Sequence, residues 1–183
     1  MTRPVRYTPD EKALLDEDND AVMMGWEKPL MSLHASIICQ RNFTGGTQYD
    51  NNCVSNNEGQ NLRPLRILNV GFGMGIIDEE IQSFKPSYHA IIEAHPSVYE
   101  RMTSHCWHKR ADVHFGKWQD VIPKMLEAGV KFDGIFFDTY GEHWLDMEDF
   151  HNYVPQLLNK PNGVYSFFNG LAPENVFFHG VGE

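Results

Sequence analysis

Short apolar segments and segments with helical spacing alternate along the chain from residue 65 to residue 168. This rhythm predicts a parallel sheet with helices on both faces, because a parallel neighbour is reached only through a crossover connection. The expected class is therefore α/β, with a doubly wound sheet. The expected strands are residues 65–70, 89–93, 113–115, 132–138 and 163–168, and the expected helices are residues 76–84, 97–105, 119–128 and 147–158.

The first 63 residues follow a different pattern. Thr8-Pro9-Asp10-Glu11 combines a capping residue, a proline and a capping-box acid, which predicts a short helix from Pro9 to about Asp16 that acts as a lid. A second helix is expected within residues 26–40. Residues 41–63 are rich in Asn, Gly and Gln, which indicates a surface loop or a disordered insertion. The predicted organisation is a flap with binding helices (1–40), a flexible insertion (41–63) and a sheet core (64–183).

The net charge of the chain limits its partners. With 25 acidic and 15 basic residues the formal charge is −10, which argues against binding to nucleic acid or to an anionic membrane and favours a cationic partner. The sequence contains neither a segment apolar enough to span a membrane nor a signal-like start, so we expect a cytoplasmic or nuclear protein. Three cysteines without metal-binding spacing are expected to be reduced thiols, and no metal is expected.

A glycine-rich loop follows the first strand of the core. Gly71-Phe72-Gly73-Met74-Gly75 opens a helix at the sheet edge where α/β proteins bind nucleotide-like ligands, and glycines let the backbone approach such a ligand. Glu93 ends the next strand, where a carboxylate can accept hydrogen bonds from a ribose diol. The pattern predicts a cofactor site but also occurs loosely in nicotinamide enzymes.

Two further carboxylates suggest a cationic substrate. Asp138 ends a strand at the same sheet edge, and Glu27 lies in a segment too apolar for a plain linker. A guanidinium presents a planar fork of donors that two carboxylates can clamp. The alternative is a surface glutamate and a helix-capping aspartate.

Two aromatic residues near the loop have alternative interpretations. Trp118 could stack on an adenine or could simply pack in the core, and His95 could cap the helix that starts at Pro96 or border a ribose.

The segments Met23 to Met31, Gly71 to Ile76, Ile92 to Pro96, Gly116 to Trp118 and Phe132 to Tyr140 resemble guanidinoacetate methyltransferase and its relatives, the type IV protein arginine N5-methyltransferases. Glu93-Ala94-His95-Pro96 and Ser166 to Leu171 look more like the protein-arginine branch. The resemblance implies the Rossmann-like fold of class I methyltransferases and S-adenosyl-L-methionine as cofactor. It also implies that Glu27 and Asp138 hold the guanidino group. The implied cofactor-binding residues are Tyr7, Met23, Met31, Gly71, Phe72, Gly73, Met74, Gly75, Ile76, Glu93, Ala94, His95, Lys117, Trp118 and Asp138.

The chain departs from that family in two respects. Relatives of the protein-arginine type usually carry ankyrin-like repeats, which this sequence lacks. The class I sheet also has seven strands, so the last helix and two strands are expected to be missing after Glu183. A helix is expected to begin within residues 173–181. The strand at 163–168 would then be an unprotected edge, through which we expect self-association.

The leading hypothesis is methyl transfer from S-adenosyl-L-methionine to the δ-nitrogen of a protein-bound arginine. Methylation of small guanidino acids is a second enzymatic hypothesis. A noncatalytic binding module is a third, and a nicotinamide-dependent oxidoreductase is a more distant fourth.

Overall fold

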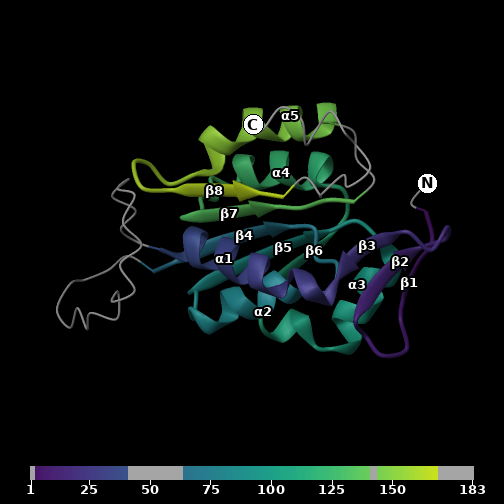
Figure 1. Cartoon of the computed structure of the whole chain (residues 1–183). Coiled ribbons are helices and arrows are strands. Elements are labelled where there is room, and N and C mark those ends of the chain that lie inside the picture. The colour runs from purple at the N-terminus through teal and green to yellow at the C-terminus, as the bar shows by residue number, and fades with distance from the viewer. Residues whose placement is uncertain (1–2, 41–63, 141–143, 169–183) are drawn as a thin grey trace, which may run out of the picture.

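The computed structural model describes residues 3–40, 64–140 and 144–168. Its centre is a five-stranded parallel sheet in the order β6-β5-β4-β7-β8 (Figure 1). The strands are β4 (Arg66–Val70), β5 (Tyr88–Glu93), β6 (Asp112–Phe115), β7 (Gly134–Phe137) and β8 (Val164–Phe167). From β4 the chain adds β5 and β6 on one side and then returns to add β7 and β8 on the other side, so the sheet is doubly wound as expected.

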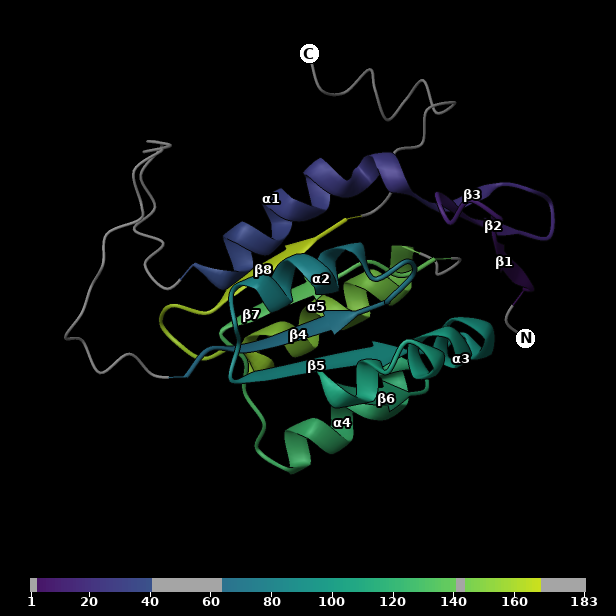
Figure 2. The same ribbon diagram turned by 90° about the horizontal axis from the view of Figure 1, so that it is seen from below.

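Helices cover both faces of this sheet, as the two views in Figures 1 and 2 show. Alternate strand residues separate the faces: Ile67 and Phe136 pack with α1 and α2, whereas Leu68, Ile135 and Phe137 pack with α4 and α5. The helices are α1 (Lys28–Cys39), α2 (Ile76–Ser83), α3 (Pro96–Ser104), α4 (Trp118–Glu127) and α5 (Trp144–Leu157), with short 3₁₀ turns η1 (Gly25–Glu27) and η2 (Trp107–Lys109).

Every strand and helix predicted between residues 65 and 168 is confirmed, with boundaries that differ by a few residues at most. The helix within residues 26–40 is also confirmed as α1, with Pro29 in its first turn. The predicted insertion at 41–63 and the expected helix at 173–181 lie outside the described residues.

The predicted lid helix from Pro9 to Asp16 is wrong. The segment belongs to a separate antiparallel sheet formed by β1 (Val5–Tyr7), β2 (Ala13–Asp16) and β3 (Ala21–Met24). Thr8 caps the turn between the first two strands: its hydroxyl accepts a hydrogen bond from the backbone N–H of Ala13 and donates one to Asp10. The same residue types that start helices also close turns, and here strand pairing and the burial of Leu14 decide between them.

Strand β8 lies at one edge of the described sheet, and Phe167 on it is exposed. Self-association through this edge stays a prediction. Within the described ranges, no helix has both the length and the apolar character needed to cross a bilayer.

Candidate functional site

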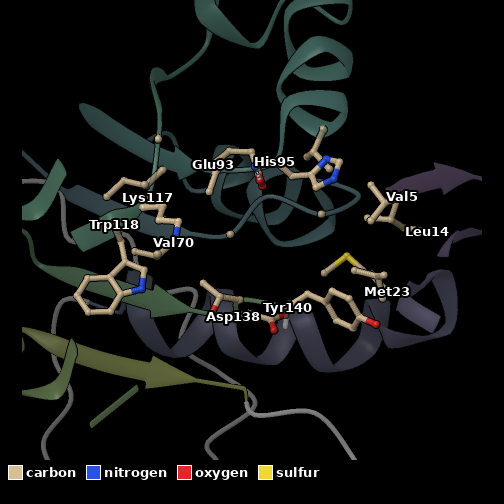
Figure 3. Close-up of a pocket in the computed structure, with 18 of the residues that line it drawn as sticks. Val5, Leu14, Met23, Val70, Glu93, His95, Lys117, Trp118, Asp138 and Tyr140 are labelled. Carbon is tan, nitrogen blue, oxygen red and sulfur yellow. Dashed lines mark hydrogen bonds between the residues drawn. The ribbon is translucent and has the colours of Figure 1, made fainter. Parts of the chain in front are cut away.

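A cavity of about 560 Å³ opens at the carboxyl ends of β4, β5 and β7, where the small N-terminal sheet meets the main one. Figure 3 shows Glu93 and Lys117 on one side of it and Asp138 and Tyr140 on the other. The residues that line it are Arg3, Val5, Leu14, Val22, Met23, Val70, Gly71, Gly73, Ile92, Glu93, Ala94, His95, Val98, Gly116, Lys117, Trp118, Asp138, Thr139 and Tyr140. Its volume is that of a typical small-molecule site.

The floor of the cavity is the glycine loop between β4 and α2. Gly71 and Gly73 have φ values of 93° and 54°, which side chains rarely adopt. A Cβ on Gly71 would lie 1.8 Å from the backbone oxygen of Asp138, and a Cβ on Gly73 would lie 2.9 Å from the sulfur of Met23. The glycines are therefore required both by backbone conformation and by close approach.

Side chains from three other elements hold this loop. The backbone N–H of Phe72 donates to Glu93 Oε2 at 2.9 Å, and the Tyr7 hydroxyl donates to the Gly73 carbonyl at 2.7 Å. The backbone N–H of Met74 lies 3.2 Å from the thioether sulfur of Met23, which accepts its hydrogen bond. The N-terminal sheet thus fixes one side of the loop, and β5 fixes the other.

Glu93 is buried at the end of β5. Besides the bond from Phe72, its Oε1 accepts a hydrogen bond from the backbone N–H of His95 at 2.6 Å. Burial raises the pKa of Glu93, and these backbone hydrogen bonds partly oppose the rise. Each carboxylate oxygen has a second lone pair, so the group can still accept hydrogen bonds from a ligand.

His95, Lys117 and Trp118 also line the cavity, and Figure 3 shows His95 on the side of Val5, away from Lys117 and Trp118. His95 is the N-cap of α3, because its Nδ1 accepts a hydrogen bond from the backbone N–H of Ser97. Its Nε2 also lies 2.9 Å from the carbonyl oxygen of Arg3. Trp118 is buried and packs edge-on against Phe150, so it serves the core and the cavity wall together.

Glu27 and Asp138 form the second chemical feature of the site. The buried Glu27 accepts a hydrogen bond from the backbone N–H of Met24 at 2.7 Å, and Asp138 lies directly after β7 at the cavity wall. Burial, and then the charge of Glu27, raise the pKa of Asp138 to about 7. Burial also raises the pKa of Glu27. Of the two, only Asp138 lines the cavity, and the charge of Glu27 beside it would stabilise a cation bound there.

Comparison with known proteins places this arrangement in a family. Residues 55–174 match the sequence model of guanidinoacetate N-methyltransferase. The chain belongs to this family. The resemblance drawn from the sequence motifs is thereby confirmed.

Relatives within the guanidinoacetate N-methyltransferase family extend beyond this chain. Protein arginine N-methyltransferase 2 of Yarrowia lipolytica is 42% identical over 177 residues, which are 96% of this chain and 34% of that protein. The protein of the same name from Saccharomyces cerevisiae is 38% identical over 175 residues, covering 94% of this chain and 38% of its own length. The chain thus spans little more than a third of these relatives.

A solved structure supports the fold. The S-adenosylmethionine-dependent methyltransferase from Agrobacterium tumefaciens superposes with a TM-score of 0.52 at 11% identity, over 94% of this chain and 55% of that one. The Rossmann-like class I fold predicted for the chain is therefore confirmed.

The structure brings most of the residues predicted from the guanidinoacetate N-methyltransferase resemblance to the cavity. Those that line it are Met23, Gly71, Gly73, Glu93, Ala94, His95, Lys117, Trp118 and Asp138. Tyr7 donates a hydrogen bond to the loop, Met74 belongs to the loop and donates its backbone N–H to Met23, and Gly75 caps α2. The Phe72 ring packs edge-on against Trp107, and Ile76 packs beside it at the start of α2. Met31 is fully buried among the residues of α1, α2 and β7 rather than at the cavity.

The contact between Tyr140 and Asp16 was not predicted from the sequence. The Tyr140 hydroxyl, at the cavity rim, donates to Asp16 Oδ2 at 2.7 Å and ties the β7–α5 loop to β2. The only available signal was that Tyr140 stands two residues after Asp138. Among the residues in the described ranges, no group of three or more histidines, cysteines or acids is placed to hold a metal ion.

Proposed function

We propose that this chain carries the catalytic site of an S-adenosylmethionine-dependent methyltransferase that methylates protein-bound arginine at the δ-nitrogen of its guanidino group. The observation that carries the proposal is the Glu27–Asp138 pair beside a glycine-lined cavity, because this pair has the charge and the chemistry to hold a guanidinium. The names of the relatives, protein arginine N-methyltransferase 2, support the choice of arginine.

The cavity residues fit S-adenosylmethionine. Glu93 at the end of β5 is placed to accept hydrogen bonds from ribose hydroxyls. The conformation of Gly71 and Gly73 leaves backbone, rather than side chain, on the cavity floor, which suits the amino-acid part of the cofactor. Lys117 and Trp118 would border the adenine, and His95 would border the ribose. When bound, S-adenosylmethionine supplies an electrophilic methyl group on a positively charged sulfur.

Glu27 and Asp138 would act on the substrate. A guanidinium between the two carboxylates replaces their mutual repulsion with attraction, so its binding lowers the pKa of both groups. The pair orients the δ-nitrogen, which gains a carbon and loses a proton during methylation. Asp138 has a pKa of about 7 in the empty site, and the bound cation lowers it, so the group is a carboxylate at neutral pH and can accept the proton as the nitrogen–carbon bond forms.

A radiolabel experiment tests the proposal. Protein containing this chain is incubated with S-adenosylmethionine labelled in its methyl group, together with an arginine-rich protein or with guanidinoacetate. We expect label in the protein fraction, recovered after hydrolysis as δ-N-methylarginine. Label found only in the small molecule would establish the guanidino-acid alternative, which the matched family's name supports. Cofactor binding without any methyl transfer would establish a noncatalytic module.

A further inference from the structure

Behind the glycine loop, between β4, β5 and α2, lies a set of polar side chains that the proposed function does not use. Asn69 and Asp78 are fully buried, His89 is 3% exposed and Gln82 is half-buried. Polar groups in an apolar core are costly unless they are hydrogen-bonded. Their contacts therefore show what the set does.

Asn69 is at the centre of these contacts. Its amide nitrogen donates to both carboxylate oxygens of Asp78, at 3.0 and 2.9 Å, and to the carbonyl oxygen of Gly71, at 2.9 Å. All three partners are acceptors, so the amide is held in one orientation. A side chain that presented an acceptor oxygen to these groups would be repelled.

His89 also contacts Asp78: its Nε2 lies 3.1 Å from Asp78 Oδ1. Gln82 fixes the tautomer of this histidine. Its amide nitrogen contacts two acceptors, His89 Nδ1 at 2.8 Å and the Arg110 carbonyl at 3.2 Å. Because His89 Nδ1 accepts, the proton of the neutral ring is on Nε2, facing Asp78.

The peptide between Gly71 and Phe72 connects this set to the cofactor site. Asn69 holds its carbonyl, and Glu93 Oε2 accepts from its N–H at 2.9 Å. A rotation of this one peptide would break both hydrogen bonds. Asn69 thus determines the direction in which the Phe72 N–H points. This N–H in turn holds the Glu93 carboxylate in place.

We propose that Asn69, oriented by Asp78 and His89, is a positioning residue for the cofactor-binding carboxylate of Glu93 and acts through the Gly71–Phe72 peptide. The inference rests on the proposed function, in which Glu93 binds the cofactor ribose. The competing explanation is that the set only satisfies its own buried polar groups and contributes to stability alone.

Two variants separate these explanations. Asp78→Asn leaves Asn69 able to donate to the Gly71 carbonyl and to the side-chain oxygen at position 78. The double variant Asn69→Asp/Asp78→Asn exchanges the amide and the carboxylate. It preserves the total charge of the unmodified chain. The hydrogen bond between the two positions is also preserved, but residue 78 now donates it to residue 69. The carboxylate at position 69 cannot donate to the Gly71 carbonyl. The two variants differ only in residue 69.

Calorimetric titration with S-adenosylhomocysteine gives the first readout. We expect Asp78→Asn to stay within about threefold of the unmodified chain and the exchange variant to bind about tenfold more weakly or worse, the scale of one lost hydrogen bond with added repulsion. Hydrogen exchange of the Phe72 amide, measured without ligand, should be faster in the exchange variant only. Thermal melts check that both variants are folded at the titration temperature, and Ser83→Ala on α2 serves as a control for substitutions on that helix.

Equal affinities and equal Phe72 exchange in the two folded variants would overturn the positioning role and leave the proposed function intact. An unmodified chain that does not bind S-adenosylhomocysteine would instead overturn the proposed function, and this inference with it. Should the exchange variant not fold, Asn69→Ser/Asp78→Asn removes the donating amide without adding a charge, and the same comparison applies.

Discussion

At the scale of single residues, the proposed substrate chemistry depends on Glu27 and Asp138. Both carboxyl groups have a raised pKa because the fold removes them from water, and Asp138 additionally faces the charge of Glu27. Neither takes part in an ion pair within the described ranges. The pair therefore favours a bound cation over the empty site.

Substitution Glu27→Gln is expected to keep affinity for S-adenosylhomocysteine within a few-fold and to lower methyl transfer by roughly 10² or more. The amide is nearly isosteric but carries no charge to orient a guanidinium. Single-turnover rates and calorimetry check both parts, with the exposed Glu100→Gln as control. Unchanged turnover would contradict the carboxylate clamp.

Gly73→Val is expected to abolish cofactor binding while the chain stays folded. Its φ of 54° disfavours a branched side chain, and the new Cβ would lie 2.9 Å from the Met23 sulfur. Gly129→Val is a matched control, since Gly129 has a φ of 67° with no atom within 4 Å of an added Cβ. Equal affinity of the two variants for S-adenosylhomocysteine would show that the loop does not contact the cofactor.

At the scale of elements, the core was predictable and the N-terminal sheet was not. Strands such as 134–137 are continuous apolar runs because both faces of a parallel sheet are covered, so their pattern is strong. Residues 9–16 carry a helix-start pattern, and only contacts distant in sequence, such as the pairing of Leu14 with Met23, reveal the strand. The same limit applies to the site: glycines and strand-end acids mark it, whereas the contact between Tyr140 and Asp16 leaves no local signal.

Tyr7→Phe tests how firmly the N-terminal sheet is attached to the loop. The substitution removes the hydrogen bond to the Gly73 carbonyl and leaves the ring under the Arg101 guanidinium. We expect about 1 kcal/mol less stability and a several-fold weaker affinity for S-adenosylhomocysteine. Urea unfolding and calorimetry measure these effects. Tyr99→Phe, at a tyrosine whose ring packs at a tilt against Phe115, is the control, and an equal effect of both substitutions would contradict a specific role.

At the scale of the whole molecule, the raised pKa of Asp138 makes the stability of the fold depend on pH. Folding raises the pKa of Asp138 from 3.8 to about 7, so between these values the folded state holds more protons than the unfolded state. The contribution of this group to the free energy of unfolding therefore falls as the pH rises from about 4 to about 7 and is constant above that range.

Asp138→Asn is expected to remove this pH dependence. The ligand-free variant should be more stable than the unmodified chain at pH 8, by an amount on the order of 4 kcal/mol, and the gain should shrink toward pH 4. It should also be inactive. Urea unfolding across this pH range measures the free energy of unfolding of the variant and of the unmodified chain. A difference between the two that stays constant with pH would show that Asp138 does not titrate as described.

The close approach of Gly71 to the backbone oxygen of Asp138 also restricts how a chain of this kind diverges. In the proposed function, the floor of the cofactor cavity and the reacting acid share this backbone contact, so a mutation that adds a side chain at Gly71 displaces both together. A lineage could not change cofactor binding at this position without also shifting the acid. New substrate preferences would have to arise at other positions that line the cavity.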